Sequence, residues 1–187
     1  PFGILVAAAR DPQNRGLYVV DNLGGNALIR FINTTNTSVT IAGKLVQAGT
    51  VRTIAGGGLE LGVGIPGTRA DLGIVTGLDI SSDGNLLYFS AQIDQEVRVL
   101  NVSSNAITVV GNSIASGNIG LVASGFGDTL GGLVVNNSNG EVYVADATPG
   151  INKVYRISTT GTVTTIAGNG ANARPDDPFV AGPALNT

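Results

Sequence analysis

Histidine, cysteine, methionine and tryptophan are all absent from this chain of 187 residues. Without histidine and cysteine there is no Ser-His-Asp triad, no thiol nucleophile, no disulfide and no zinc site built from either residue. Charged side chains are also scarce, at 12% of residues, about half the usual share in soluble domains. Composition leaves room for a hydrolase with paired carboxylates, but no pattern in the sequence brings two carboxylates together.

Positive charge is too sparse for a nucleic-acid partner. Ten Lys and Arg residues face 13 Asp and Glu residues, and the net charge is -3. Nucleic-acid binding requires a basic field, so we expect no such partner. The longest uncharged stretch, 99–127, is interrupted by Asn, Ser and Gly, and therefore predicts no membrane insertion. The glycine runs lack the Lys-Ser/Thr of a phosphate loop, and we predict no cofactor.

Glycine is abundant, with 28 residues, and it separates the strands of a repeat. Three segments, 1–21, 75–90 and 130–146, each read as an apolar strand, a polar turn and a second strand centred on a tyrosine. Downstream, each copy has a polar residue four positions before an arginine and then a Thr/Val strand that ends in glycine. The repeated residues are Tyr18, Tyr88 and Tyr143, then Arg30, Arg98 and Arg156, and finally the closing segments 53–56, 108–111 and 165–168.

Four short strands in each copy, rich in Val, Ile, Thr and Tyr and separated by Gly/Asn/Asp turns, are typical of a propeller blade. We therefore predict an all-β fold, a β-propeller segment of three four-stranded antiparallel blades. The blades cover residues 1–74, 75–129 and 130–187, and the last includes a link to a following blade. A hairpin-like insertion near 34–50 accounts for the extra length of the first blade.

The second blade is the most divergent of the three. Ser90 stands where the other blades have Asp21 and Asp146, and the segment 117–127 replaces the link expected between blades.

Several motifs carry a resemblance to a known family: P-F-G-I at 1–4, L-Y-V-V-D at 17–21, V-Y-V-A-D at 142–146, and T-I-A-G-x-G at 53–58 and 165–170. Together they resemble NHL repeats, the six-bladed propeller family, over nearly the whole chain. The resemblance implies that three of six blades are present. It also implies a possible lyase or lactonase activity, but such propellers rely on histidine and bound metal, which argues against catalysis in this segment.

Three blades do not close a ring, because both end blades would leave one face in water. The last residues followed by the first, G-P-A-L-N-T-P-F-G-I, read as an uninterrupted family junction. We therefore expect neighbouring blades from outside this chain. They belong either to a longer polypeptide or to copies that associate head to tail, two making six blades or many making an open array.

Asp21 and Asp146 follow the tyrosine strand in the same register and are the first candidate site residues. One interpretation makes them calcium or substrate ligands. The favoured interpretation has their carboxylates accepting N–H bonds in the turn before the third strand. No D-x-D-x-D-G run supplies further calcium ligands, and we predict no metal site.

Arg30, Arg98 and Arg156 recur at what the sequence presents as one structural position. They can form a ring of guanidinium groups for a carboxylate or phosphate ligand. The favoured alternative pairs each arginine with an acidic or carbonyl group of its own blade. The three tyrosines are expected to pack between blades.

The sequence thus favours a non-catalytic propeller segment, extracellular or at a cell surface and of bacterial origin, that serves as a structural and interaction scaffold. Its partner is another protein or further copies of itself, bound through the end blades. The alternative is a fragment of a propeller enzyme, of the lyase or lactonase/hydrolase type, with catalytic residues outside this chain.

Overall fold

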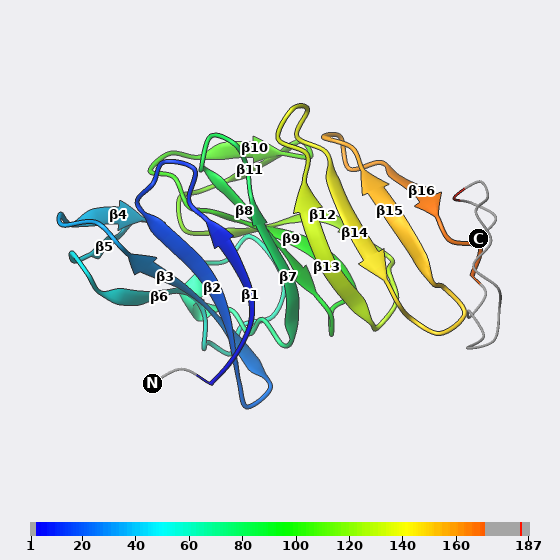
Figure 1. Cartoon of the computed structure of the whole chain (residues 1–187), viewed down its shortest axis with the longest axis horizontal. Coiled ribbons are helices and arrows are strands. Elements are labelled where there is room, and N and C mark those ends of the chain that lie inside the picture. Colours follow the sequence, from blue (N-terminus) through cyan, green and yellow to red (C-terminus); the bar gives the residue numbers. More distant parts are fainter. Residues whose placement is uncertain (1–2, 171–183, 185–187) are drawn as a thin grey trace.

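A computed structural model describes residues 3–170 and residue 184 of the chain. The described residues form sixteen strands and one short 3-10 helix, arranged as three four-stranded antiparallel sheets and two separate hairpins. The three four-stranded sheets lie side by side in chain order (Figure 1). This arrangement is a three-bladed β-propeller segment, and the predicted fold class is confirmed.

The strands of each blade are ordered here from the innermost to the outermost; the link predicted at the end of the third blade lies largely outside the described residues. The first blade contains β1 (Ile4–Arg10), β2 (Gly16–Leu23), β3 (Asn26–Asn33) and β6 (Val51–Gly56); the second contains β7 (Val75–Ile80), β8 (Leu86–Ala91), β9 (Glu96–Asn101) and β12 (Ile119–Ser124); the third contains β13 (Leu130–Val135), β14 (Val142–Asp146), β15 (Lys153–Ile157) and β16 (Val163–Ala167). The first strands β1, β7 and β13 pack against one another along the inner edge.

The hydrophobic core consists of two clusters, one in each gap between neighbouring blades. Side chains alternate between the two faces of a strand, so every blade has one face toward its predecessor and one toward its successor. Tyr18 and Phe31 of the first blade, whose ring centroids are 4.8 Å apart, pack in the first cluster with Phe89 of the second. Tyr88 of the second blade and Val144 of the third lie in the second cluster.

The hairpin predicted near 34–50 is present, and the second blade repeats it. The first hairpin is β4 (Val39–Ile41) with β5 (Lys44–Val46), and the second is β10 (Ile107–Val109) with β11 (Asn112–Ile114). The offset from β4 to β10 in the sequence equals the offset from β6 to β12, so hairpin and closing strand recur as one unit.

The assignment of 108–111 as the closing strand of the second blade was therefore wrong, because these residues belong to the second hairpin and its turn. The closing strand is β12, within the segment predicted as an atypical link. Both hairpin and closing strand have the same Thr/Ile/Val pattern ending in glycine, as 40–43 and 53–56 illustrate, and the pattern alone does not separate them.

The extra length of the first blade lies in its link to the second blade, not in the hairpin. This link contains the 3-10 helix η1 (Gly67–Arg69) and runs along the outer edge of β12. The Gly64 N–H donates to the carbonyl of Ile119 over 2.7 Å, and the Ile119 N–H donates to the carbonyl of Ile65 over 3.0 Å.

A buried asparagine anchors each hairpin. The Nδ2 of Asn33 donates to the carbonyls of Thr37, Val46 and Gln47 at 2.8, 3.1 and 3.1 Å. Asn101 repeats the arrangement in the second blade, where its Nδ2 donates to the carbonyls of Asn105 and Ile114 at 2.7 and 2.8 Å.

The hairpins also reach the next blade. The Ala42 N–H, at the tip of the first hairpin, donates to the carbonyl of Val102 in the second blade over 2.9 Å. Val110, at the tip of the second hairpin, packs on Gly161 of the third blade. A Cβ added at Gly161 would lie 2.6 Å from Cγ1 of Val110. The third blade has only a short turn, 158–162, between β15 and β16.

The inner strands approach too closely at Gly77 of β7 for a side chain to fit. A Cβ at this position would lie 2.6 Å from the backbone nitrogen of Leu133 and 2.9 Å from the carbonyl oxygen of Gly131. Both obstacles are backbone atoms of β13 and do not rotate away.

Gly77→Ala is therefore expected to lower the free energy of unfolding by about 1–3 kcal/mol, the usual cost of overpacking. Gly132→Ala on β13 is the matched control, because a Cβ there meets no atom within 4 Å. Urea unfolding followed by circular dichroism measures both. Equal stability of the two variants would contradict the close approach of β7 and β13.

Candidate functional site

Asp21 and Asp146 are buried, and their carboxylates bind backbone N–H groups of the segment that leads into their own blade. Oδ1 of Asp21 accepts the N–H of Gly3 at 2.7 Å, and Oδ2 of Asp146 accepts the N–H of Gly127 at 2.7 Å. Oδ1 of Asp146 also accepts the N–H of Thr148, in the turn before β15, at 3.1 Å. Each aspartate thus fastens the segment that enters the first strand of its blade to the second strand.

The position of Ser90 was wrongly equated with that of the two aspartates. Asp21 and Asp146 each lie three residues after the tyrosine of their blade, and the residue three positions after Tyr88 is Ala91. The hydroxyl of Ser90 instead donates to the carbonyl of Gly131 in the third blade over 2.9 Å.

Arg30 and Arg98 occupy equivalent positions and form ion pairs within their own blades. A guanidinium nitrogen of Arg30 lies 2.8 Å from Asp21 Oδ2. Arg98, which lacks an aspartate at the equivalent position, pairs with Glu96 at 2.6 Å and with Asp94 at 3.2 Å. Both arginines therefore pair with acidic groups of their own blades, which is the alternative to a common ring.

Arg156 does not share this position, and the equivalence inferred from the sequence was wrong. Strand pairing places Arg30 opposite Val19, beside Tyr18, whereas Arg156 lies directly opposite Tyr143. Arg156 therefore lies on the other face of its blade. Among the described residues, its nearest carboxylate is that of Glu141, at 3.7 Å. The three guanidinium groups thus form no common ring.

The three tyrosines occupy equivalent positions in different surroundings. Tyr18 and Tyr88 are buried between blades, whereas Tyr143, on the outer face of the third blade, is half-buried and donates from its hydroxyl to Glu141 over 3.1 Å. Burial raises the pKa of the Tyr18 hydroxyl, and the negative charge of Asp11 raises it further. Burial, with a smaller effect of Asp83, also raises the pKa of Tyr88.

The first blade exposes an apolar face that is buried in the second blade. Leu17 is 38% exposed, whereas Leu87 at the equivalent position of the second blade is fully buried at 0%. Val51 is 42% exposed, and its equivalent Ile119 is also at 0%. The difference arises because the first blade covers these residues of the second.

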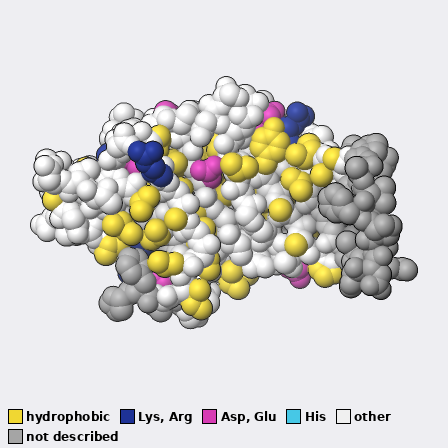
Figure 2. All heavy atoms as spheres, in the orientation of Figure 1, with side chains coloured by type: hydrophobic (Ala, Val, Ile, Leu, Met, Phe, Trp, Pro, Cys, Tyr) yellow, Lys and Arg dark blue, Asp and Glu magenta, His cyan; other side chains and the backbone are white. Residues whose placement is uncertain are grey.

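The third blade exposes its opposite face. Val134 is 54% exposed, and Val154 and Ile166 are half-buried. Their counterparts in the first blade include Ile29 and Ile54, which are buried against the second blade. In Figure 2, hydrophobic side chains gather over β1 and β2 and again over β14 and β15. The sequence predicts that the end faces are exposed to water, and strand register identifies the residues that lie on them.

Among the described residues, no three His, Cys, Asp or Glu side chains lie close enough together to hold a metal ion. In the same part of the chain, no helix has the length and hydrophobicity needed to cross a membrane.

No family model and no curated protein matches the sequence. Solved β-propeller structures match its fold. One from a nidogen/laminin complex is 15% identical, with a TM-score of 0.61, and the match covers 89% of this chain and 49% of that one. A protein of unknown function from Bacteroides thetaiotaomicron is 19% identical, with a TM-score of 0.55, and the match covers 89% of this chain and 36% of that one.

TolB from Acinetobacter baumannii is 12% identical, with a TM-score of 0.54 and coverage of 89% and 33%. The chain therefore spans half or less of the length of these structures. At such low identity the likeness establishes the β-propeller fold alone.

If Asp146 is a structural acceptor, Asp146→Asn should lower the free energy of unfolding by about 1–3 kcal/mol, because one carboxylate oxygen is replaced by an NH₂ that faces an N–H donor. Adding 5 mM CaCl₂ should leave the melting temperature of the wild-type chain unchanged. A calcium-dependent rise in melting temperature that Asp146→Asn abolishes would favour the ligand interpretation instead.

The buried tyrosines predict a loss of stability at high pH. A raised pKa in the folded state means that stability is fully present below the unfolded value of 10.0 and falls as the pH rises above it. The Tyr18→Phe/Tyr88→Phe double variant should escape this loss, which amounts to at most about 1.4 kcal/mol per pH unit for each tyrosine. Denaturant unfolding between pH 8 and 11.5 measures it, and parallel curves for both proteins would contradict the prediction.

Proposed function

We propose that this chain is a non-catalytic, NHL-type propeller segment that acts as an extracellular structural and interaction scaffold, and that its two end faces are covered by further blades. Those blades come from a longer polypeptide or from other copies of the chain. The observation that carries the proposal is the exposure, on each end blade, of positions that are buried between blades elsewhere in the same chain.

The outer face of the first blade supports this proposal through a charged group as well as apolar ones. Arg30, which pairs with Asp21, lies at the position that Arg98, which pairs with Glu96, occupies in the second blade. Arg98 is buried against the first blade, so this type of interface accommodates a guanidinium that is paired within its own sheet. The face of the first blade therefore has the chemistry of an inter-blade surface.

The outer face of the third blade is less apolar than the corresponding faces within the chain. Arg156 stands at the position of Phe31 in the first blade and Val99 in the second, and it lies near Glu141. A blade that covers this face must leave that pair in contact with water or supply a polar partner. This requirement favours one specific neighbour over nonspecific hydrophobic contact.

The composition supports a scaffold rather than an enzyme. The carboxylates of Asp21 and Asp146 accept hydrogen bonds from backbone N–H groups, and Asp21 also pairs with Arg30. These contacts stabilise the fold. An extracellular location agrees with the low charge and the many Thr, Asn and Gly residues.

In isolation the chain should self-associate through its end faces. Val134→Glu places a carboxylate on the outer face of the third blade, and it should weaken association at least tenfold. A tenfold change corresponds to about 1.4 kcal/mol, and a buried unpaired charge costs more than that. Sedimentation velocity between 5 and 200 µM measures the effect.

Leu45→Glu is the control, because Leu45 is as exposed as Val134 but lies on the first hairpin, away from both end faces. It should leave association unchanged. A wild-type chain that remains a folded monomer at 200 µM, or equal weakening by both substitutions, would contradict the proposed role of the end faces.

A further inference from the structure

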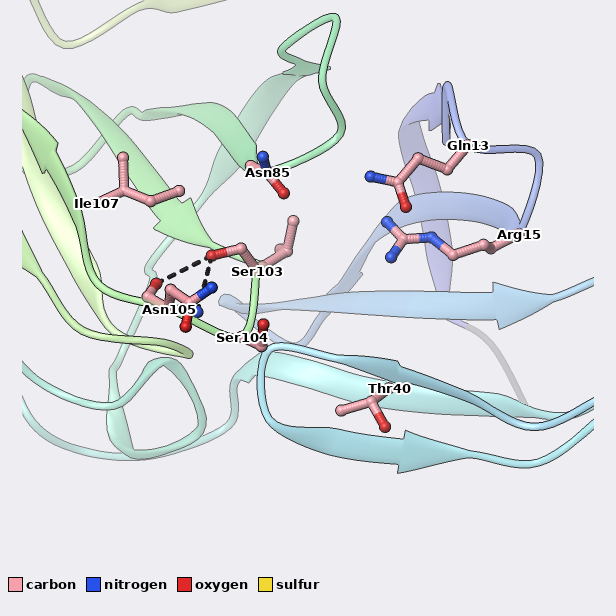
Figure 3. Close-up of a pocket in the computed structure, with 9 residues that line it drawn as sticks. Gln13, Arg15, Thr40, Asn85, Ser103, Ser104, Asn105 and Ile107 are labelled. Atoms are coloured by element: carbon pink, nitrogen blue, oxygen red, sulfur yellow. Dashed lines mark hydrogen bonds between the residues drawn. The ribbon is translucent and has the colours of Figure 1, made fainter.

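A cavity of about 460 Å³ lies where the first and second blades meet beside the first hairpin. The turn after β1 contributes Gln13 and Arg15, and β4 contributes Thr40. The second blade contributes Asn85 and the turn 103–105. In Figure 3, Gln13 and Arg15 point into the hollow from one side, facing Ser103 and Asn105 across it. The volume is that of a small-molecule site.

The charge in this cavity is neutralised. Nε and one terminal nitrogen of Arg15 donate to the two carboxylate oxygens of Asp11 at 2.7 and 3.0 Å, and Asp11 is fully buried. An anionic ligand would have to compete with this carboxylate for the guanidinium. The described residues that line the cavity include no carboxylate to attract a cation.

The remaining polar groups of the lining are hydroxyls and amides. Gln13 donates from Nε2 to the carbonyl of Asp83 over 2.8 Å, which orients its side chain and leaves Oε1 as an acceptor. The hydroxyls of Thr40 and Ser104 and the side-chain amide of Asn105 add further donors and acceptors. Val102 and Ile107 add aliphatic surface.

This combination restricts the ligand. An apolar molecule would bury the hydroxyls and amides without partners, at a cost in free energy. In the described part of the lining, no aromatic side chain offers a stacking surface for a base or an aromatic ring. A polyhydroxylated ring fits, because its hydroxyls both donate and accept, and its C–H face can lie on aliphatic side chains.

We propose that this cavity binds an uncharged sugar residue, either free or at the end of a glycan. Such a site goes beyond a scaffold role, since it would give the inter-blade groove a ligand of its own.

The related groove between the second and third blades explains why only one site is expected. It measures about 320 Å³ and includes Thr108, the counterpart of Thr40, but Tyr88 and five aliphatic residues make up much of its wall (Leu86, Val109, Val110, Val122 and Val142). The described lining of this groove contains no side-chain amide, and Asp83 adds a carboxylate, so its wall is more apolar than that of the first cavity and carries a negative charge.

The test titrates ¹⁵N-labelled chain with methyl β-D-glucopyranoside, methyl β-D-galactopyranoside, N-acetylglucosamine and chitotriose, each to 20 mM, with glucuronate and inorganic phosphate as anionic probes. At least one sugar should shift the amide signals of Thr40, Ser104 and Asn105. Tighter binding of chitotriose than of the monosaccharide would indicate a glycan end, and equal binding a free sugar.

Thr40→Trp should fill the cavity and weaken binding at least tenfold. Thr108→Trp is the matched control, since it fills only the other groove, and should change binding less than twofold. Ser104→Trp provides a second blocking variant in case Thr40→Trp disturbs the hairpin. The proposal would be overturned if no sugar binds, if Thr108→Trp weakens binding as much as Thr40→Trp, or if phosphate or glucuronate binds more tightly than every sugar.

Discussion

Face-to-face packing of the sheets is the constraint on which the rest of the structure depends. A blade has apolar residues on both faces, and it is stable only when both faces are covered. The second blade meets this condition inside the chain, which is why Leu87 and Ile119 are buried. The first and third blades meet it on one side only. Short contacts such as that of Gly77 with β13 follow from the same packing at its narrowest point.

The overall fold was predictable from the sequence because it depends on signals that recur. Glycine-bounded runs of Val, Ile and Thr predict strands whatever their surroundings, and three copies of the tyrosine strand predict three blades. The closing strand of the second blade was missed because the hairpin segment 108–111 has the Thr/Val pattern that ends in glycine, whereas the closing strand β12 contains no threonine. Comparison of 40–43 with 108–111, at the offset that also relates Arg30 to Arg98, would have identified the second hairpin.

The errors in the candidate site have a different physical origin. Arg156 and Arg30 both follow a polar residue by four positions, but strand pairing shifts one of them by a single residue, and a single residue reverses the face of a strand. The spacing of residues along the sequence does not reveal which residues pair across neighbouring strands. Likewise, the cavity beside the first hairpin combines Gln13 with Asn105, residues that only the packing of two blades brings together. Asp146 accepts a turn N–H from Thr148, as its sequence position suggests, whereas the contacts of Asp21 with Gly3 and Arg30 follow from strand pairing.

The hairpins give the series of blades a direction. Each hairpin extends from its own blade onto the following one, as the Ala42–Val102 hydrogen bond illustrates, and the third blade has only a turn at the equivalent place. The hairpins, third strands and fourth strands of the first two blades recur at one constant offset, so these two blades share one plan from the third strand onward. An array lengthened by duplication of such a blade would keep its direction, because each added hairpin would again extend onto the blade that follows it.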